Sequence, residues 1–363
     1  MIADRPLLLG PGVPLALGSA LLFGASTPLA KMLLGSIDPW LLAGILYLGA
    51  GLGLSIVHLA RHGLGLPAVE APLRGPDLPW LAGIVLVGGV LGPLLLMLGL
   101  ARTDAASTSL LLNLEGLATM GIAWLVFHEN VDRRLLLGAF AILAGGIVLA
   151  WGGSVRGDLG ALAVAGACVC WGIDNNLTRK LSGSDPLQIA ALKGLVAGSV
   201  NLGAAFAGGA LVPTWSPVLA AGLVGFLGYG VSLALFVAAL RHLGAARTGA
   251  YFALAPFVGA VLAVLLLDEP LSAHLLVAGG LMVIGLWLHL AERHEHEHRH
   301  ERIEHEHRHA HDAHHRHDHG PDDPGGEPHS HRHPHEPQVH RHPHYPDLHH
   351  RHAHGKRPVL PTT

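Results

Sequence analysis

The sequence predicts an all-α integral membrane protein, with ten transmembrane helices arranged as two inverted five-helix repeats, followed by a disordered tail. Three observations predict this fold class: charge is sparse before residue 291, ten apolar segments follow one another there, and motifs of the first half recur in the second. The expected divisions are a first repeat over residues 13–151, a second over 157–290 and a histidine-rich tail over 292–363.

Charge is unevenly distributed along the 363 residues. Of the 29 histidines, 23 follow Leu290, together with 13 of the 26 acidic residues and 10 of the 23 lysines and arginines. A soluble domain carries charge on about a quarter of its residues, whereas this chain has only 13% overall. The body before the tail therefore lacks a charged surface, so we expect the lipid bilayer to be its main solvent and partner.

Ten segments are apolar enough to cross the hydrocarbon, which takes about 20 residues with a range of roughly 17–25. The breaks between them are short and carry most of the charges. The segments span residues 13–34, 40–59, 78–101, 105–127, 135–151, 159–177, 188–207, 217–240, 248–267 and 274–290. Glycines four apart, at 49/53, 88/92 and 194/198, favour close packing between helices.

The distribution of lysine and arginine in the short loops predicts the orientation. The loops after the second, fourth, sixth and eighth segments hold most of the basic residues, whereas the opposite loops hold only Arg102 and Arg156. We therefore expect a multi-pass protein of the inner or plasma membrane, with both termini and the tail in the cytoplasm.

Two motifs occur once in each half. Residues 105–131 align without a gap to residues 245–271; both begin with Ala-Ala-x-Thr and close with a glutamate, Glu129 or Glu269, before an apolar residue. The matched positions of the other motif are Phe23, Gly24, Leu29 and Lys31 in the first half, and Trp171, Gly172, Leu177 and Arg179 in the second. Because each repeat holds an odd number of helices, the second repeat is expected to be inverted in the membrane.

This pattern resembles the drug/metabolite transporter superfamily in its EamA-type form, over residues 13 to 290. The resemblance implies gradient-driven transport of a small solute, often export, and no enzyme activity. The family usually has a proline midway along the fourth and ninth helices. Pro256 matches that pattern, whereas its counterpart is Gly116, preceded by Glu115. The sequence has no phosphate-binding loop and no nucleic-acid pattern, and a homodimer is compatible with it.

Glu115 lies near the middle of its apolar segment. Hydrocarbon disfavours a charged carboxylate, so this group would exchange protons as a site opens to either side. The alternative is a neutral acid that only bonds a neighbouring helix. Pro28, beside Ser26 and Thr27, and Pro256 are the predicted hinges, because proline removes a helical hydrogen bond.

Polar residues gather at the expected cytoplasmic end of the sixth segment. They are Asp174, Asn175 and Asn176, and Lys193 enters the seventh segment from the same side. We expect Asp174 and Lys193 to lie at similar depth and to pair. Together with Glu115, these residues are the predicted transport path, although a structural ion pair between two helices remains the alternative.

The tail alternates histidine with charged residues and has no repeating apolar positions, which predicts disorder. Neutral imidazole binds nickel, cobalt and zinc, so we expect the tail to bind such metals; no cofactor is otherwise required. The predicted metal ligands are His294, His296, His298, His300, His305, His307, His309 and His311.

Three functions remain open from the sequence. The favoured one is an exporter of divalent transition-metal cations such as nickel, cobalt or zinc, supplied by the tail. The second is an exporter of a small metabolite or an amino acid whose tail responds to metal. The third, from another class, is a membrane-anchored metal buffer or sensor that transports nothing.

Overall fold

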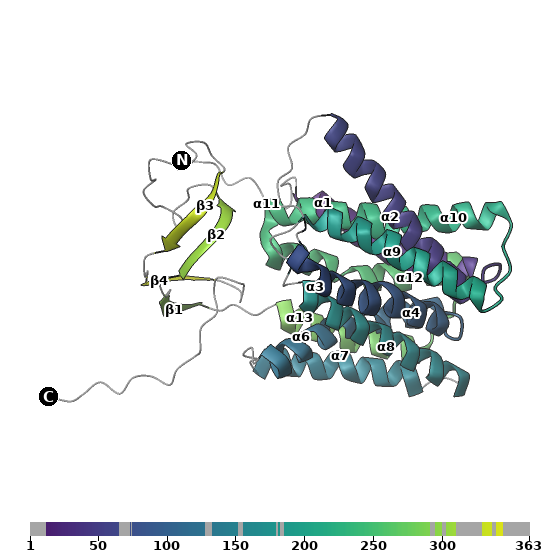
Figure 1. Ribbon diagram of the computed structural model, residues 1–363. Helices are drawn as coiled ribbons and strands as arrows, with labels where there is room; N and C mark the ends of the chain where they lie inside the picture. Colours follow the sequence, from purple (N-terminus) through teal and green to yellow (C-terminus); the bar gives the residue numbers. More distant parts are fainter. Residues whose placement is uncertain are drawn as a thin grey trace. The chain divides into compact units, whose positions relative to one another are not determined.

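The computed structural model describes residues 12–64, 73, 75–127, 133–151, 155–178, 181 and 185–290, together with four strands in the tail. The chain divides after Leu290 into a helical body and a C-terminal unit (Figure 1).

The body consists of helices only, within the described residues. In the first half they are α1 Gly12–Leu33, α2 Pro39–Gly63, η2 Gly75–Asp77, α3 Leu78–Gly83, η3 Ile84–Leu91, α4 Gly92–Leu100, α5 Ala105–Leu111, α6 Leu114–Phe127 and α7 Arg133–Trp151. In the second half they are α8 Val155–Thr178, α9 Pro186–Ala207, α10 Trp215–Gly225, η5 Phe226–Val231, α11 Ser232–Phe252, α12 Ala255–Leu267 and α13 Ala273–Leu290. Of these, η2 is a 3₁₀ turn, and η3 and η5 are π-helical.

The outward faces of these helices are apolar. Leu125, Phe140 and Leu265 are between 66% and 69% exposed, and many other large apolar side chains are exposed as well. Water would make such a surface unfavourable, whereas lipid tails solvate it, and each helix satisfies its own backbone hydrogen bonds. The body is therefore an all-helical membrane domain, as predicted.

Eight helical stretches in the described part of the chain are long and apolar enough to span a membrane. They are Gly12–Leu33, Pro39–Arg61, Gly75–Leu100, Ala105–Val126, Arg133–Trp151, Pro186–Ala207, Trp215–Leu240 and Arg247–Leu267. A shorter apolar helix covers Ala273–His289. The predicted sixth segment lies in α8, which carries Asp174, Asn175 and Asn176 among its apolar residues. The count of ten spans remains a prediction.

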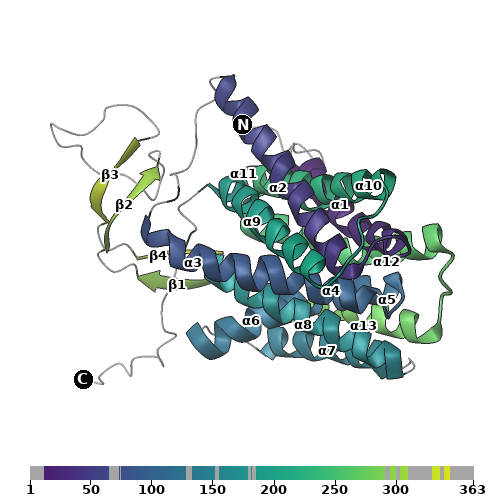
Figure 2. The ribbon, with the colours of Figure 1, turned by 45° about the vertical axis from the view of Figure 1, so that its right-hand side comes forward.

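Helices at matching places in the two halves pack in a two-fold pattern. α1 packs against α11 and α12, and α8 packs against α4 and α6. α2 packs along α9, as Figures 1 and 2 show, and α7 packs along α13. When first-half helices are exchanged for their second-half counterparts, the contacts of α1 become the contacts of α8, and the α2–α9 and α7–α13 contacts map onto themselves.

Glycines allow the closest of these contacts. A Cβ added to Gly194 of α9 would lie 2.7 Å from the Cα of Gly51 of α2, and one added to Gly198 would lie 2.6 Å from the backbone nitrogen of Leu48. No side chain fits at such distances, so both positions require glycine. The predicted packing role of this glycine pair is confirmed.

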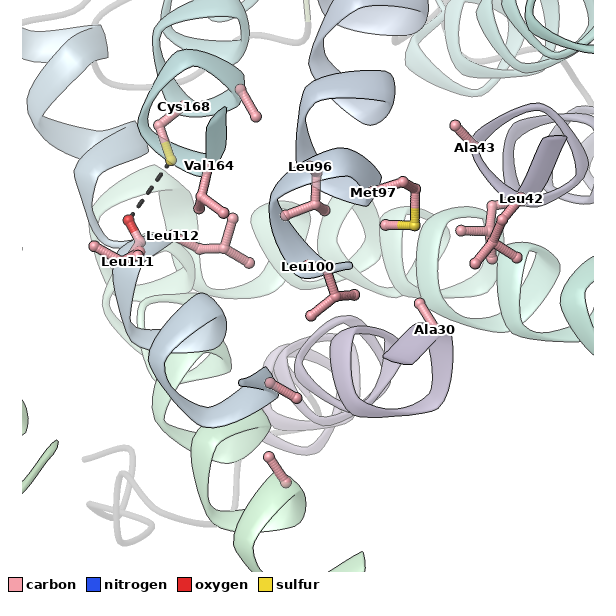
Figure 3. Close-up of a cluster of buried hydrophobic side chains, with 14 of the residues drawn as sticks. Ala30, Leu42, Ala43, Leu96, Met97, Leu100, Leu111, Leu112, Val164 and Cys168 are labelled. Carbon is pink, nitrogen blue, oxygen red and sulfur yellow. Dashed lines mark hydrogen bonds between the residues drawn. The ribbon is translucent and has the colours of Figure 1, made fainter. Parts of the chain in front are cut away.

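The buried core lies where α1, α2, α4, α5 and α8 meet. Figure 3 shows Leu96, Met97 and Leu100 of α4 pointing toward these neighbours, with all three side chains at most 1% exposed. Cys168 is buried, and its Sγ lies 3.6 Å from the carbonyl oxygen of Leu111. It packs as a small core residue.

Several helices are interrupted where the sequence predicted continuous segments. The predicted fourth segment breaks at Leu112 and Asn113, because the Asn113 side chain donates to the Leu110 carbonyl oxygen at 2.9 Å and competes with the helical bonds. The ninth breaks at Ala253 and Leu254, just before Pro256, which lacks the amide donor that a helix needs.

The predicted boundary between the eighth and ninth segments is also wrong in one respect. Residues 241–247, expected to form a loop, have helical backbone within α11. Leucine, alanine and arginine in this stretch are good helix formers, so polarity alone does not end the helix.

The tail contains four short strands where disorder was predicted. They are β1 Glu295–Arg299, β2 Ile303–His309, β3 His329–His335 and β4 Val339–Pro343. β1 pairs with β4 and β2 with β3, both antiparallel. Alternation of histidine with other residues has the two-residue period of a strand, and the sequence prediction overlooked this second meaning of the pattern.

Candidate functional site

An ion pair joins α8 to α9. The Nζ of Lys193 donates to Oδ2 of Asp174, and the two side chains are 17% and 7% exposed, respectively. The expected pairing of these residues is therefore confirmed. Asp174 lies directly against the backbone of η3, because a Cβ added to Gly88 would fall 2.5 Å from the Asp174 Cβ. Only glycine in η3 leaves room for this carboxylate.

Glu115 lies in the first turn of α6, immediately after the interruption of the fourth segment. Its Oε1 accepts a hydrogen bond from Nδ2 of Asn175 at 3.0 Å. The same amide also donates to Oγ1 of Thr119 at 3.1 Å, and that hydroxyl donates to the Glu115 carbonyl oxygen at 2.9 Å. The start of a helix carries partial positive charge, so this location favours a carboxylate more than mid-helix would.

Asn176 has a different role from its neighbour. It is buried, and its Nδ2 donates to the carbonyl oxygens of Gly172 and Thr119 at 2.8 and 3.0 Å. A Cβ on Gly172 would lie 2.7 Å from the Ala118 Cβ, so α8 and α6 touch at this point. The amide therefore joins two helices, and its place along the transport path stays a prediction.

The carboxyls and the ammonium form one electrostatic group. Asp174, which pairs with Lys193, is the sequence neighbour of Asn175, whose amide binds the Glu115 carboxyl. The hydroxyl of Tyr47 in α2 donates to the carbonyl oxygen of Gly88, the glycine that Asp174 contacts. The structure thus brings together Glu115, Asp174, Asn175 and Lys193 around α6, α8 and α9. It does not test which of them contacts a solute.

The carbonyl oxygens of η3 are bound by side chains that sequence reasoning missed. A π-helix shifts the backbone hydrogen bonds by one residue and weakens the local ladder. Gly88 O accepts from the Tyr47 hydroxyl at 3.1 Å and from the Trp171 indole nitrogen at 3.0 Å. Asn201 of α9 reaches Gly89 O at 3.4 Å. The only sequence signal was the rarity of polar groups in these apolar segments.

An aromatic cluster adjoins this polar group. Ring centroids of Tyr47 and Tyr229 lie 5.7 Å apart, and Phe23 lies 5.8 Å from Tyr229 and 5.2 Å from Phe252. Phe252 also contacts Phe236, with centroids 5.0 Å apart. Tyr47 therefore links the aromatic side, formed by α1, η5 and α11, to the ion pair on the other side.

The two sides correspond to matching places in the two halves. Gly228 of η5 faces Ser26 of α1: a Cβ added to Gly228 would lie 2.7 Å from the Ser26 Cβ. Gly88 faces Asp174 in the same way. Ser26 and Asp174 both lie three residues after the aromatic residue of the repeated motif. One half thus holds a hydroxyl where the other holds a carboxylate.

The predicted hinges differ in the structure. α1 continues without a break through Pro28, which is buried within it. Pro256 lies at the start of α12, directly after the break at Ala253 and Leu254. Neither observation tests movement, so both hinges stay predictions.

Charged residues at the ends of helices act as caps. The Glu269 carboxylate accepts from the backbone amides of Ala105 and Ala106 at 2.7 and 2.8 Å, which caps α5. Lys31 donates to the carbonyl oxygens of Leu100 and Thr103, both at 2.6 Å, at the end of α4. Lys31 therefore binds backbone carbonyl groups within the protein. The matching Glu129 and Arg179 lie outside the described residues.

The predicted metal ligands are divided between strands and undescribed residues. His296 and His298 lie in β1, and His305, His307 and His309 lie in β2. The other three, His294, His300 and His311, lie outside the described residues.

Comparisons with known proteins agree with this architecture. The sequence matches the model of the EamA-like transporter family twice, over residues 10–151 and 158–291. It is 30% identical over 285 residues to a protein of Methanothermobacter thermautotrophicus described as an uncharacterized transporter, a match that covers 74% of this chain and 83% of that protein. A solved crystal structure has a similar fold, with a TM-score of 0.56 and 21% identity over 76% of this chain and 96% of that one. Both halves of the helical body thus carry the family pattern, and the chain belongs to the EamA-like transporter family of multi-pass membrane proteins.

Proposed function

We propose that the chain is a secondary transporter that exports a small solute, and that Glu115 couples this movement to protons. The position of Glu115 carries the proposal: it is a carboxyl at the start of an interrupted helix, bonded to Asn175 and within reach of two further charges. Ionisable groups inside a membrane domain are costly and mark substrate paths or proton relays.

The proposed architecture is ten helices in two inverted repeats, divided as residues 13–151 and 157–290. The two-fold packing of α1 with α12 and of α8 with α6 supports it. The interruptions before α6 and α12 fall at matching places, and such broken helices line the central sites of transporters with inverted repeats. Alternating access would then move one half against the other around the polar group.

One candidate substrate is a divalent transition-metal cation, gathered by the tail in the cytoplasm. Glu115, Asp174 and Asn175 would supply oxygen atoms along the path. Oxygen ligands select nickel or copper poorly. In the part of the chain that the structure describes, no three His, Cys, Asp or Glu side chains converge on a metal-sized site. Support for a metal substrate therefore comes from the tail alone.

The second candidate is a zwitterionic metabolite such as an amino acid, and the ion pair favours it. Lys193 and Asp174 present opposite charges that match the carboxylate and the ammonium of such a solute. The neighbouring rings of Tyr47, Tyr229 and Phe23 would contact an apolar side chain. On binding, Lys193 would pair with the carboxylate of the solute and Asp174 with its ammonium, so neither side chain would be left without an opposite charge.

The coupling role is tested with Glu115→Gln in reconstituted vesicles. If Glu115 carries the proton, the variant folds but loses uphill transport driven by a pH gradient, while exchange at equal concentrations survives because it moves no net proton. If Glu115 binds the solute, both activities fall. Wild-type rates in both assays would show that Glu115 only joins helices, and would reject the coupling proposal.

The substrate is tested with a protein that ends after Leu290, assayed with zinc, nickel and amino acids. Metal flux that persists without the tail supports the first candidate, and amino-acid flux supports the second. An absence of flux in the full chain and in the truncated chain would instead support a membrane-anchored metal buffer or sensor.

A further inference from the structure

Three residues of α8 contact a single residue of α6, Thr119. Gly172, Asn175 and Asn176 lie three and four residues apart, so they share one side of their helix. A Cβ added to Gly172 would lie 2.9 Å from the backbone nitrogen of Thr119. The amide of Asn176 donates to the Thr119 carbonyl oxygen at 3.0 Å. The backbone of Thr119 is therefore held against α8 at this point.

The hydroxyl of Thr119 can only accept a hydrogen bond from Asn175. A hydroxyl carries one hydrogen and two acceptor positions. The Thr119 hydroxyl donates its hydrogen to the Glu115 carbonyl oxygen at 2.9 Å. The side chain of Asn175 lies 3.1 Å from the same hydroxyl, so the nitrogen of its amide, and not the oxygen, must face Thr119.

This orientation of the amide decides what Asn175 offers to Glu115. An asparagine side chain presents a donor or an acceptor, depending on whether its nitrogen or its oxygen faces the partner. The nitrogen that faces Thr119 also lies 3.0 Å from Oε1 of Glu115 and donates to it. A donor stabilises an ionised carboxylate more than a protonated acid. The Thr119 hydroxyl thus acts on the Glu115 carboxyl through Asn175.

The other half closes the matching helix crossing without these groups. In the alignment of the two halves, Gly259 stands at the place of Thr119, and Ala255 at that of Glu115. A Cβ added to Gly259 would lie 2.8 Å from the Gly24 carbonyl oxygen, so α1 and α12 meet closely there. The crossing itself can therefore form without a hydroxyl at this place.

We propose that Thr119 is a positioning residue, which holds Asn175 as a hydrogen-bond donor to Glu115 and thereby sets the pH at which this carboxyl binds and releases its proton. This role rests on the proposed coupling function of Glu115 and adds the residue that tunes it. Without the hydroxyl, the amide can turn its oxygen towards Glu115 and accept from the protonated acid. The carboxyl then keeps its proton to a higher pH.

Other ionisable groups lie on the elements around α6. They are Arg156, Asp158, Cys168, Cys170 and Asp174 of α8, Lys193 of α9, Tyr47 of α2, and Arg133 and Arg134 of α7. Asp174 pairs with Lys193, and the Tyr47 hydroxyl donates to the Gly88 carbonyl oxygen. In the part of the chain that the structure describes, none of these groups bonds the Thr119 hydroxyl. Removing that hydroxyl therefore disturbs none of their hydrogen bonds.

The test compares Thr119→Val with Thr119→Ser in the full-length protein. Valine keeps the shape of threonine without the hydroxyl, whereas serine keeps the hydroxyl. Ser55→Ala is the matched control, because the Ser55 hydroxyl also donates to the carbonyl oxygen four residues earlier, but in α2. Infrared spectra recorded over a pH titration follow the carbonyl band of the protonated Glu115 carboxyl, which is identified by its absence in Glu115→Gln.

In Thr119→Val, the pH at which half of this band is lost should rise by about one unit, a roughly tenfold gain in proton affinity that matches the loss of one hydrogen bond. Thr119→Ser and Ser55→Ala should keep the midpoint of the wild type. An unchanged midpoint in Thr119→Val, or equal shifts in Thr119→Val and Thr119→Ser, would overturn the positioning role.

The titration needs no solute, so it separates the positioning role from the coupling role. If Thr119→Val shifts the midpoint while Glu115→Gln transports uphill at the wild-type rate, the coupling proposal fails and the positioning role stands. If no Glu115 band titrates over the whole pH range in which the protein stays folded, both are rejected.

Discussion

Removing one charge of the Asp174–Lys193 pair should destabilise the body strongly. The two side chains are 7% and 17% exposed, so Asp174→Asn leaves the Lys193 ammonium buried without its counter-charge. Breaking a buried pair from one side typically costs about 3–5 kcal/mol, which is roughly a hundredfold to several thousandfold in the unfolding equilibrium. Lys193→Met should have a similar effect for the same reason.

Replacing both residues distinguishes the charge effect from packing. The double variant Asp174→Asn/Lys193→Met removes the unpaired charge and should recover most of the lost stability, since apolar or neutral replacements of an ion pair are often tolerated. Arg102→Gln, at an exposed position, is the control for loss of a charge and should change stability by less than about 0.5 kcal/mol. Unfolding in mixed micelles with a denaturing detergent gives the free energies.

If the double variant is as unstable as the sum of the single variants, packing rather than pairing holds the helices, and the electrostatic reasoning fails. The same folded double variant also separates the two roles of the pair. Solute flux at the wild-type rate would mean that the pair is structural, whereas loss of flux in a stable protein would place it on the path.

Three further predictions concern packing, capping and orientation. Gly194→Ala should lower the free energy of unfolding by about 1–3 kcal/mol, because the added methyl group meets α2. Gly203→Ala on the same helix, with no atom within 4 Å of its added Cβ, should be neutral or slightly stabilising. Equal changes in the free energy of unfolding in detergent would contradict the α2–α9 contact. Glu269→Ala removes both bonds to the start of α5 and should cost about 0.5–2 kcal/mol by the same assay; an unchanged free energy would mean that the cap is redundant. Reporter fusions after Arg134 should report cytoplasm and those near Thr103 the outside, as the loop charges predict; the reverse pattern would invert the orientation and move the tail out of the cytoplasm.

Zinc binding by the tail should depend on pH. An imidazole binds metal only when neutral, and its ordinary pKa is about 6.5. Affinity should therefore fall steeply below about pH 6, and binding near that pH should release protons. Calorimetry of the full-length protein in buffers with different ionisation enthalpies measures both effects. Affinity independent of pH between 5 and 8 would exclude histidine as the ligand.

Composition and residue spacing account for the features of the body that could be predicted. Apolar segments, the repeated motifs and the pairing of Asp174 with Lys193 could be read directly, because depth in a membrane helix is obtained by counting residues. The break at Leu112 and Asn113 could not, because it depends on a single amide that bonds the Leu110 carbonyl. The π-helical stretches η3 and η5 also have no sequence pattern that a hydropathy profile reveals.

The candidate site was predicted in part. Glu115 and Asn175 were singled out separately, but their contact depends on how α6 crosses α8, which tertiary packing decides. Tyr47 was overlooked because a tyrosine in an apolar segment resembles an ordinary core residue.

The matched contacts at Gly88 and Gly228 bear on how such a protein changes its chemistry. The same backbone frame surrounds both positions, yet Asp174 fills one and Ser26 fills the other. A duplicated scaffold can therefore exchange a neutral side chain for a charged one without rebuilding its helix crossings. Both halves share the close contact between a glycine and the facing side chain, whereas only the second half carries a charge there. An engineer who wanted a different cargo could begin at Ser26, which faces Gly228 as Asp174 faces Gly88.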